Sequence, residues 1–128
     1  MELYETNYIY LRRLAPRLRV GADHAVSRLK DGVDLHLRVL DRHRYTTSVG
    51  LTHYFHAGSG GEVLPNLRVR IYHDARVAEV MPDSDLAAFA PWRRGHRPEV
   101  GTLGWRWEVN RFLNRWLRYC LGEGHAMP

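Results

Sequence analysis

Two stretches of the chain carry apolar residues at helical spacing. Apolar side chains recur every three or four positions over residues 3–14, which predicts a helix there, and Pro16 ends it because proline lacks an N–H and clashes with the preceding turn. The C-terminal stretch has the clearer pattern and predicts a helix of about four turns. Its apolar face consists of Val109, Phe112, Leu113, Trp116, Leu117 and Cys120.

Alternating apolar and polar residues in the middle of the chain predict β-strands. The four expected strands cover residues 33–39, 45–55, 67–72 and 76–81. The links between them are short and polar or rich in glycine, so we expect consecutive strands to pair as an antiparallel meander.

Three other segments lack a regular pattern. Residues 19–31 are polar and residues 57–66 are rich in glycine, so both are expected to be loops. Residues 82–104 contain several prolines and glycines, which favours an irregular crossing segment with a short helix over residues 85–90. Trp92 is the residue expected to anchor this segment to the core.

These elements predict one domain over residues 1–128, of the α+β class. The simplest arrangement has two layers: a four-stranded antiparallel sheet with the N-terminal and C-terminal helices packed on one face. Asn7 would then lie in the apolar stripe of the first helix, where we expect it to bond to a strand or loop backbone, or else to contact a ligand. The opposite sheet face would carry a basic and aromatic patch of Arg38, Arg68, Arg70 and Tyr72.

Composition excludes several classes of protein. The single cysteine, Cys120, cannot form an internal disulfide or a multi-cysteine zinc site, and its place on an apolar helix face indicates a small buried side chain. No apolar run is long enough to cross a membrane, and the acidic N-terminus does not resemble a signal peptide. We therefore expect a cytoplasmic protein that makes no membrane contact.

The positive charge is concentrated in one part of the sequence. The formal net charge is +5, and residues 93–118 contain seven arginines against two glutamates, which accounts for the whole excess. Arg111, Arg115 and Arg118 lie on the side of the C-terminal helix opposite its apolar face, so they predict an exposed basic stripe. Arginine binds phosphate and carboxylate groups in a bidentate fork, which suits an anionic partner.

Four blocks of the sequence resemble the YqiB-like family of small uncharacterised bacterial proteins. They are Leu11-Arg12-Arg13-Leu14-Ala15-Pro16 (after Asn7), Arg44-Tyr45-Thr46-Thr47, Tyr72-His73-Asp74-Ala75 and Trp116-Leu117-Arg118-Tyr119-Cys120-Leu121. The blocks occur in the family's order and span nearly the whole chain. The resemblance implies a bacterial, cytoplasmic protein and no particular activity. Residues 92–108 depart from the family's pattern, because only Glu108 keeps the acidic character expected there.

The Tyr72-His73-Asp74 sequence is the densest polar cluster. His73 is a candidate general base oriented by Asp74, with Arg70 and Glu79 nearby. The structural alternative makes Asp74 a turn former that bonds its own backbone, with His73 beside the hairpin.

Other catalytic and cofactor sites are not indicated. His53 and His56 fall on opposite faces of an extended segment, which argues against a shared metal ion. The glycine-rich stretch at 57–61 is not followed by the Lys-Ser/Thr of a phosphate-binding loop. We therefore expect no metal and no cofactor.

The leading hypothesis is a non-enzymatic binding or adaptor module for an anionic partner, either RNA or an acidic protein surface. Its contacts would come from the sheet patch or from the basic stripe of the last helix. The alternative is a small enzyme or sensor that acts on a nucleotide or phosphate ester through His73, Asp74, Glu79 and Arg70. An enzyme of that kind needs a cleft in which these side chains converge.

Overall fold

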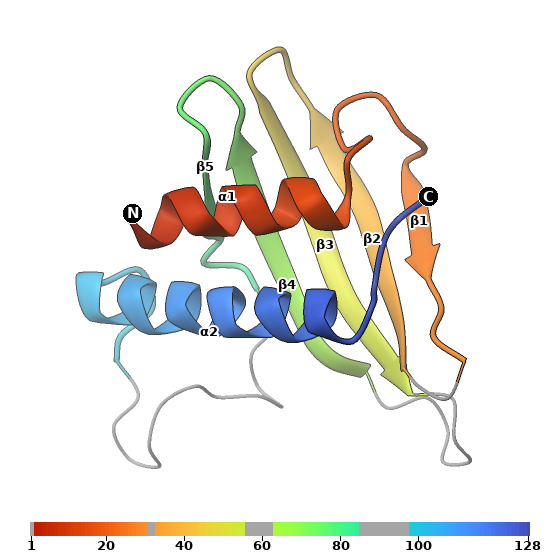
Figure 1. Cartoon of the computed structure of the whole chain (residues 1–128). Helices are drawn as coiled ribbons and strands as arrows, with labels where there is room; N and C mark the ends of the chain where they lie inside the picture. The colour runs from red at the N-terminus through yellow and green to blue at the C-terminus, as the bar shows by residue number, and fades with distance from the viewer. Residues whose placement is uncertain (1, 31–32, 56–62, 85–97) are drawn as a thin grey trace.

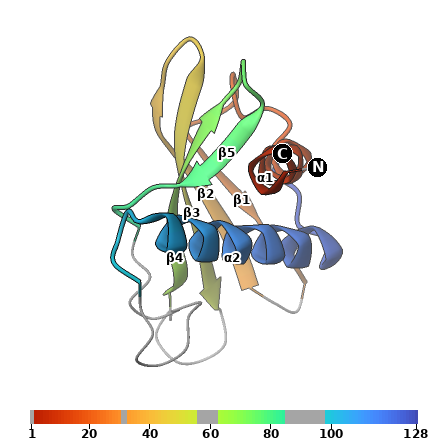
Figure 2. The same cartoon turned by 90° about the vertical axis from the view of Figure 1, so that its left-hand side faces the viewer.

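The computed structural model describes residues 2–30, 33–55, 63–84 and 98–128 (Figure 1). The elements are α1 (Leu3–Leu14), β1 (His24–Ser27), β2 (Val33–Arg42), β3 (Thr46–Phe55), β4 (Val63–Tyr72), β5 (Val77–Val80) and α2 (Leu103–Gly122). The strands form one antiparallel sheet in the order β1-β2-β3-β4-β5. Both helices cross the same face of this sheet (Figure 2), as the amphipathic patterns predicted.

The sheet has five strands where the sequence predicted four. The additional strand, β1, lies in the segment that was expected to be a loop, and it pairs antiparallel with the middle of β2. Its four residues, His-Ala-Val-Ser, are too few to show an alternating pattern. The C-terminal segment also holds this strand, because the backbone N–H of Ala126 donates to Ser27 Oγ (3.0 Å) and His125 Nδ1 lies 2.8 Å from the same oxygen.

Several element boundaries differ from the predicted ones. The last helix begins at Leu103, where the Thr102 hydroxyl accepts a hydrogen bond from the Trp105 N–H (3.3 Å) and so caps the helix. The fourth strand of the sheet, β4, begins at Val63, inside the expected glycine-rich loop. The short helix expected over residues 85–90 and the anchor Trp92 lie outside the described residues.

A network of buried amides joins both helices to the sheet. Asn110 of α2 accepts a hydrogen bond from the Val80 N–H of β5 (2.8 Å) through its side-chain oxygen. Asn7 of α1 donates to the Asn110 carbonyl (3.3 Å) and accepts from Asn114 Nδ2 (3.1 Å). The partners of Asn7 are therefore on the other helix, not on a strand or loop as the sequence suggested. Because Asn7 and Asn110 are fully buried, these bonds fix how the two helices pack.

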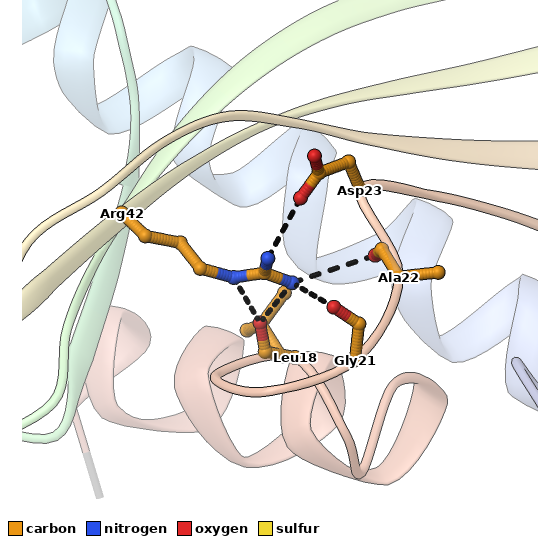
Figure 3. A network of polar contacts seen from close by, with 5 residues as sticks. All are labelled: Leu18, Gly21, Ala22, Asp23 and Arg42. Carbon is orange, nitrogen blue, oxygen red and sulfur yellow. Dashed lines mark hydrogen bonds and ion pairs between the residues drawn. The ribbon is translucent and has the colours of Figure 1, made fainter.

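Arg42 at the end of β2 holds the loop that follows α1. Figure 3 shows its guanidinium donating to the carbonyls of Leu18 and Gly21 (2.7 Å to Gly21) and to the carboxylate of Asp23 (2.8 Å). Gly21 is required in this loop, since a Cβ atom there would come within 2.7 Å of the Arg17 carbonyl oxygen. The path of residues 17–23 is thus held by the half-buried guanidinium of Arg42.

Candidate functional site

The sheet face away from the helices carries the predicted basic residues in one cross-strand row. Arg38 of β2 pairs with Gly50 of β3, and Gly50 pairs with Arg68 of β4. Gly50 leaves a gap between the two arginines, because a Cβ atom there would meet nothing within 4 Å. Arg38 and Arg68 are both exposed.

Acidic side chains pair with part of the positive charge on this face. Arg68 forms an ion pair with Asp83 (3.2 Å), and Arg70 stands directly opposite Glu79 in the β4–β5 register. Glu79 also accepts hydrogen bonds from the Tyr72 hydroxyl (3.0 Å) and from Arg106 Nη2 (2.7 Å). Burial, followed by the contact with Glu79, raises the pKa of Tyr72. The sheet face therefore brings the predicted residues together, with Arg68 engaged by Asp83 and Glu79 shared by Tyr72 and Arg106.

The candidate catalytic residues do not converge. His73 is buried beneath α1, where its ring packs against Tyr8, whereas Glu79 lies on the opposite sheet face with Tyr72. Asp74 is exposed in the β4–β5 turn, and its carboxylate accepts a hydrogen bond from the Ala75 N–H (2.9 Å). Asp74 is thus a turn former, as the structural alternative proposed, and the three groups do not share a cleft.

The outer side of α2 presents a different surface, which we call the α2 stripe. It consists of Trp107, Arg111, Arg115, Arg118 and Tyr119, all of them exposed. Four of them, Trp107, Arg111, Arg115 and Tyr119, recur at every fourth position and so form a continuous ridge along the helix. The Arg111 guanidinium lies 5.8 Å from the centre of the Trp107 ring, which is a cation–π contact.

The three arginines of the α2 stripe are free to bind an external group. Within the parts of the chain that the structure describes, none of them forms an ion pair. Two exposed aromatic rings lie at the ends of the ridge, Trp107 at 52% and Tyr119 at 60% exposure. The arrangement thus combines unpaired positive charge with flat apolar rings.

The sequence pattern predicted the arginines of the stripe but not its aromatic residues. Tyr119 is exposed, whereas Trp116, three residues earlier on the same helix, is buried. The signal was present in the sequence, because Trp107 and Tyr119 fall four residues before Arg111 and four residues after Arg115. Trp107 belongs to the segment that departs from the family's usual pattern.

Beneath the stripe, the inner side of α2 holds a buried histidine and cysteine. His53 of β3 accepts a hydrogen bond from Trp116 Nε1 (2.9 Å), and its other ring nitrogen lies 3.4 Å from Cys120 Sγ. Burial raises the pKa of Cys120 to about 12, so the thiol stays protonated and unreactive. This pair is part of the core, as expected for a cysteine on an apolar helix face.

Among the side chains that the structure describes, no three of His, Cys, Asp or Glu gather closely enough to hold a metal ion. Over the same ranges, no helix has both the length and the hydropathy needed to cross a bilayer.

Comparison with known proteins places the chain among its relatives. Residues 10–126 match the family described as "Protein of unknown function (DUF1249)". The chain belongs to this family. It is 35% identical over 124 residues to the "Uncharacterized protein YqiB" of Escherichia coli strain K12, and equally to that of strains O6:H1 and O157:H7. These alignments cover 97% of this chain and 87% of each relative. No solved structure matches.

The DUF1249 assignment confirms the family resemblance seen in the sequence blocks. Neither the family's description nor the relatives' names state an activity or a ligand. The geometry and charge of the α2 stripe are therefore the features that point to a function.

Proposed function

We propose that this protein is a non-enzymatic binding module for single-stranded RNA, and that the α2 stripe is its contact surface. The observation that carries the proposal is the difference between the two groups of arginines. On the sheet face Arg68 is paired with Asp83 and Arg70 stands opposite Glu79, whereas Arg111, Arg115 and Arg118 are all exposed and form no ion pair in the described chain. An unpaired arginine binds phosphate without first breaking an ion pair.

The exposed aromatic rings favour RNA over an acidic protein surface. Trp107 and Tyr119 lie at the two ends of the arginine ridge, where unstacked bases can stack on them. Stacking of a base on an aromatic side chain contributes about 1–3 kcal/mol. A carboxylate has no extended ring with which to stack on these side chains, as a nucleobase has. The alternative of a phosphate-ester enzyme loses support, since His73 and Glu79 lie on opposite faces of the sheet.

The proposal is tested by fluorescence anisotropy with a labelled single-stranded RNA of mixed sequence at several salt concentrations. If the three arginines each contact a phosphate, replacing all of them with glutamine lowers the slope of log affinity against log salt by about 2. The matched control replaces Arg68 and Arg70, the arginines of the sheet face, with glutamine. This control variant is expected to bind as the wild type does.

Two further variants separate RNA from an acidic protein partner. Trp107→Ala and Tyr119→Ala leave the charge unchanged and remove the stacking surfaces, so each is expected to weaken RNA binding by about tenfold. The proposal is wrong if the aromatic variants bind RNA normally while polyglutamate competes as well as RNA does. It is also wrong if the sheet-face variant loses as much affinity as the α2 variant.

A further inference from the structure

A cavity of about 250 Å³ lies at the β5 edge of the sheet, between the β4–β5 pair and the first turns of α2. Cavities that bind small molecules typically combine apolar walls with a few polar groups that fix the orientation of the ligand. This cavity has both kinds of lining. Its polar side chains are Arg70, Tyr72, Glu79 and Arg106, and its apolar side chains are Val80, Met81, Pro82 and Trp105.

Arg106 is the cation in this lining that has free donors. Its Nη2 atom donates to Glu79 Oε2 (2.7 Å), and its side chain is 43% exposed. Its Nε and Nη1 groups have no hydrogen-bond partner among the residues that the structure describes. Glu79 therefore holds the guanidinium at the cavity and leaves N–H groups available for an anion.

The charge of the lining matches an anion that carries one negative charge. Both carboxylate oxygens of Glu79 already accept a hydrogen bond, from the Tyr72 hydroxyl (3.0 Å) and from Arg106. Arg70 stands opposite Glu79 in the β4–β5 register and supplies a second positive charge. Two arginines against one glutamate leave one positive charge without a counterion in the lining, so a monoanion balances it and a dianion exceeds it.

The apolar walls are held in place before a ligand binds. The Val80 N–H donates to the Asn110 side chain (2.8 Å), and the Met81 N–H donates to the Arg68 carbonyl (2.7 Å). Val80 and Trp105 are also part of the buried core, which fixes their side chains. A preorganised site of this kind loses little conformational entropy on binding.

We propose that this cavity binds a small organic monocarboxylate whose apolar part is about the size of one aromatic ring. The carboxylate accepts hydrogen bonds from the free N–H groups of Arg106, and the apolar part contacts Val80, Met81 and Trp105. A cavity of about 150 Å³ is enough to hold benzene, so about 250 Å³ accommodates a ring and its carboxylate. The cavity shares no residue with the α2 stripe, so this site does not depend on RNA binding.

The test titrates the full chain with sodium benzoate and follows the Trp105 indole N–H and the Arg106 Nε–H by NMR. Sodium chloride of the same ionic strength serves as the reference. We expect benzoate to shift both resonances saturably and chloride to leave them in place. Benzamide has the shape of benzoate without its charge, and acetate has the charge without the ring. Each is expected to bind at least about tenfold more weakly than benzoate.

Two substitutions on α2 provide the matched pair. Arg106→Gln removes the positive charge and keeps a side chain that can donate to Glu79, so it is expected to weaken benzoate binding by at least about tenfold. Arg111→Gln, on the exposed α2 stripe, is expected to change it by less than about twofold. If Arg106→Gln does not fold, Arg70→Gln takes its place, because it removes the other positive charge of the lining.

Three results would overturn the proposal. The first is the absence of a saturable shift with benzoate. The second is binding of benzamide or inorganic phosphate as tight as that of benzoate. The third is full affinity for benzoate in Arg106→Gln, or in Arg70→Gln where that variant replaces it.

Discussion

The buried His53 makes the stability of this protein depend on pH in a predictable way. Its Nδ1 accepts the Trp116 indole N–H (2.9 Å), so the single proton of the neutral ring lies on Nε2, beside Cys120 Sγ (3.4 Å). Protonating Nδ1 would break the bond to Trp116. Burial, followed by the nearby His125, lowers the pKa of His53 from 6.5 to about 4.

As the pH falls, His53 binds a proton in the unfolded chain before it does so in the folded chain, and this order sets the direction of the change in stability. In the unfolded chain His53 binds a proton below its ordinary pKa of 6.5, whereas in the folded chain it does so only near pH 4. Acid therefore stabilises the unfolded state, and the free energy of unfolding falls as the pH drops through this window. The loss from His53 alone reaches about 2.5 kcal/mol at about pH 4.5. That is a large share of the 5–15 kcal/mol typical of a domain.

The assay is urea unfolding of the wild type and of His53→Gln between about pH 7 and about pH 4.5. Glutamine does not titrate, its amide oxygen can accept the Trp116 N–H, and its amide N–H can reach Cys120. We expect the wild type to lose about 2.5 kcal/mol more than the variant over this range. His73 and His125, whose pKa values are also lowered by burial, are present in both proteins and cancel.

Two results would refute this reasoning. One is an equal pH dependence of stability in the wild type and in His53→Gln. The other is an NMR titration in which the His53 ring of the folded protein takes up its proton near pH 6.5. Either result would mean that the ring is solvated despite its position between the sheet and α2.

Two substitutions test the packing of α2 by the same urea assay. Trp116→Ala removes a core indole and the donor to His53, so it should cost roughly 3–5 kcal/mol, and a stable cooperative variant would show that this helix face is not core. Asn110→Ala leaves the Val80 N–H buried without its acceptor and should cost about 2–4 kcal/mol. The exposed Asn66 of β4 lies outside this network and is the control, and its replacement by alanine should cost about 1 kcal/mol or less; equal losses from the two asparagines would contradict the network described above.

The spacing of apolar residues alone predicted most of the fold. The apolar stripes of both helices point to the sheet, and the inward residues of β2, β3 and β4 match the alternating pattern. These elements are long enough that burial of one face produces a clear periodic pattern of apolar residues in the sequence. The strand β1 has no such pattern in its sequence. Its pairing to β2 and the contact of Ser27 with the C-terminal segment hold it in place instead. Partners that far apart in the sequence do not show in a local pattern.

The candidate sites divide in the same way. The sequence determined the helical class of α2 and the outward position of Arg111, Arg115 and Arg118, because residue spacing fixes which side chains share a helix face. Only the tertiary structure decided which arginines remain unpaired. Arg68 meets Asp83 because the chain after β5 returns beside β4. Whether a charge is free depends on which groups folding brings beside it, and sequence spacing carries no information about those distant neighbours.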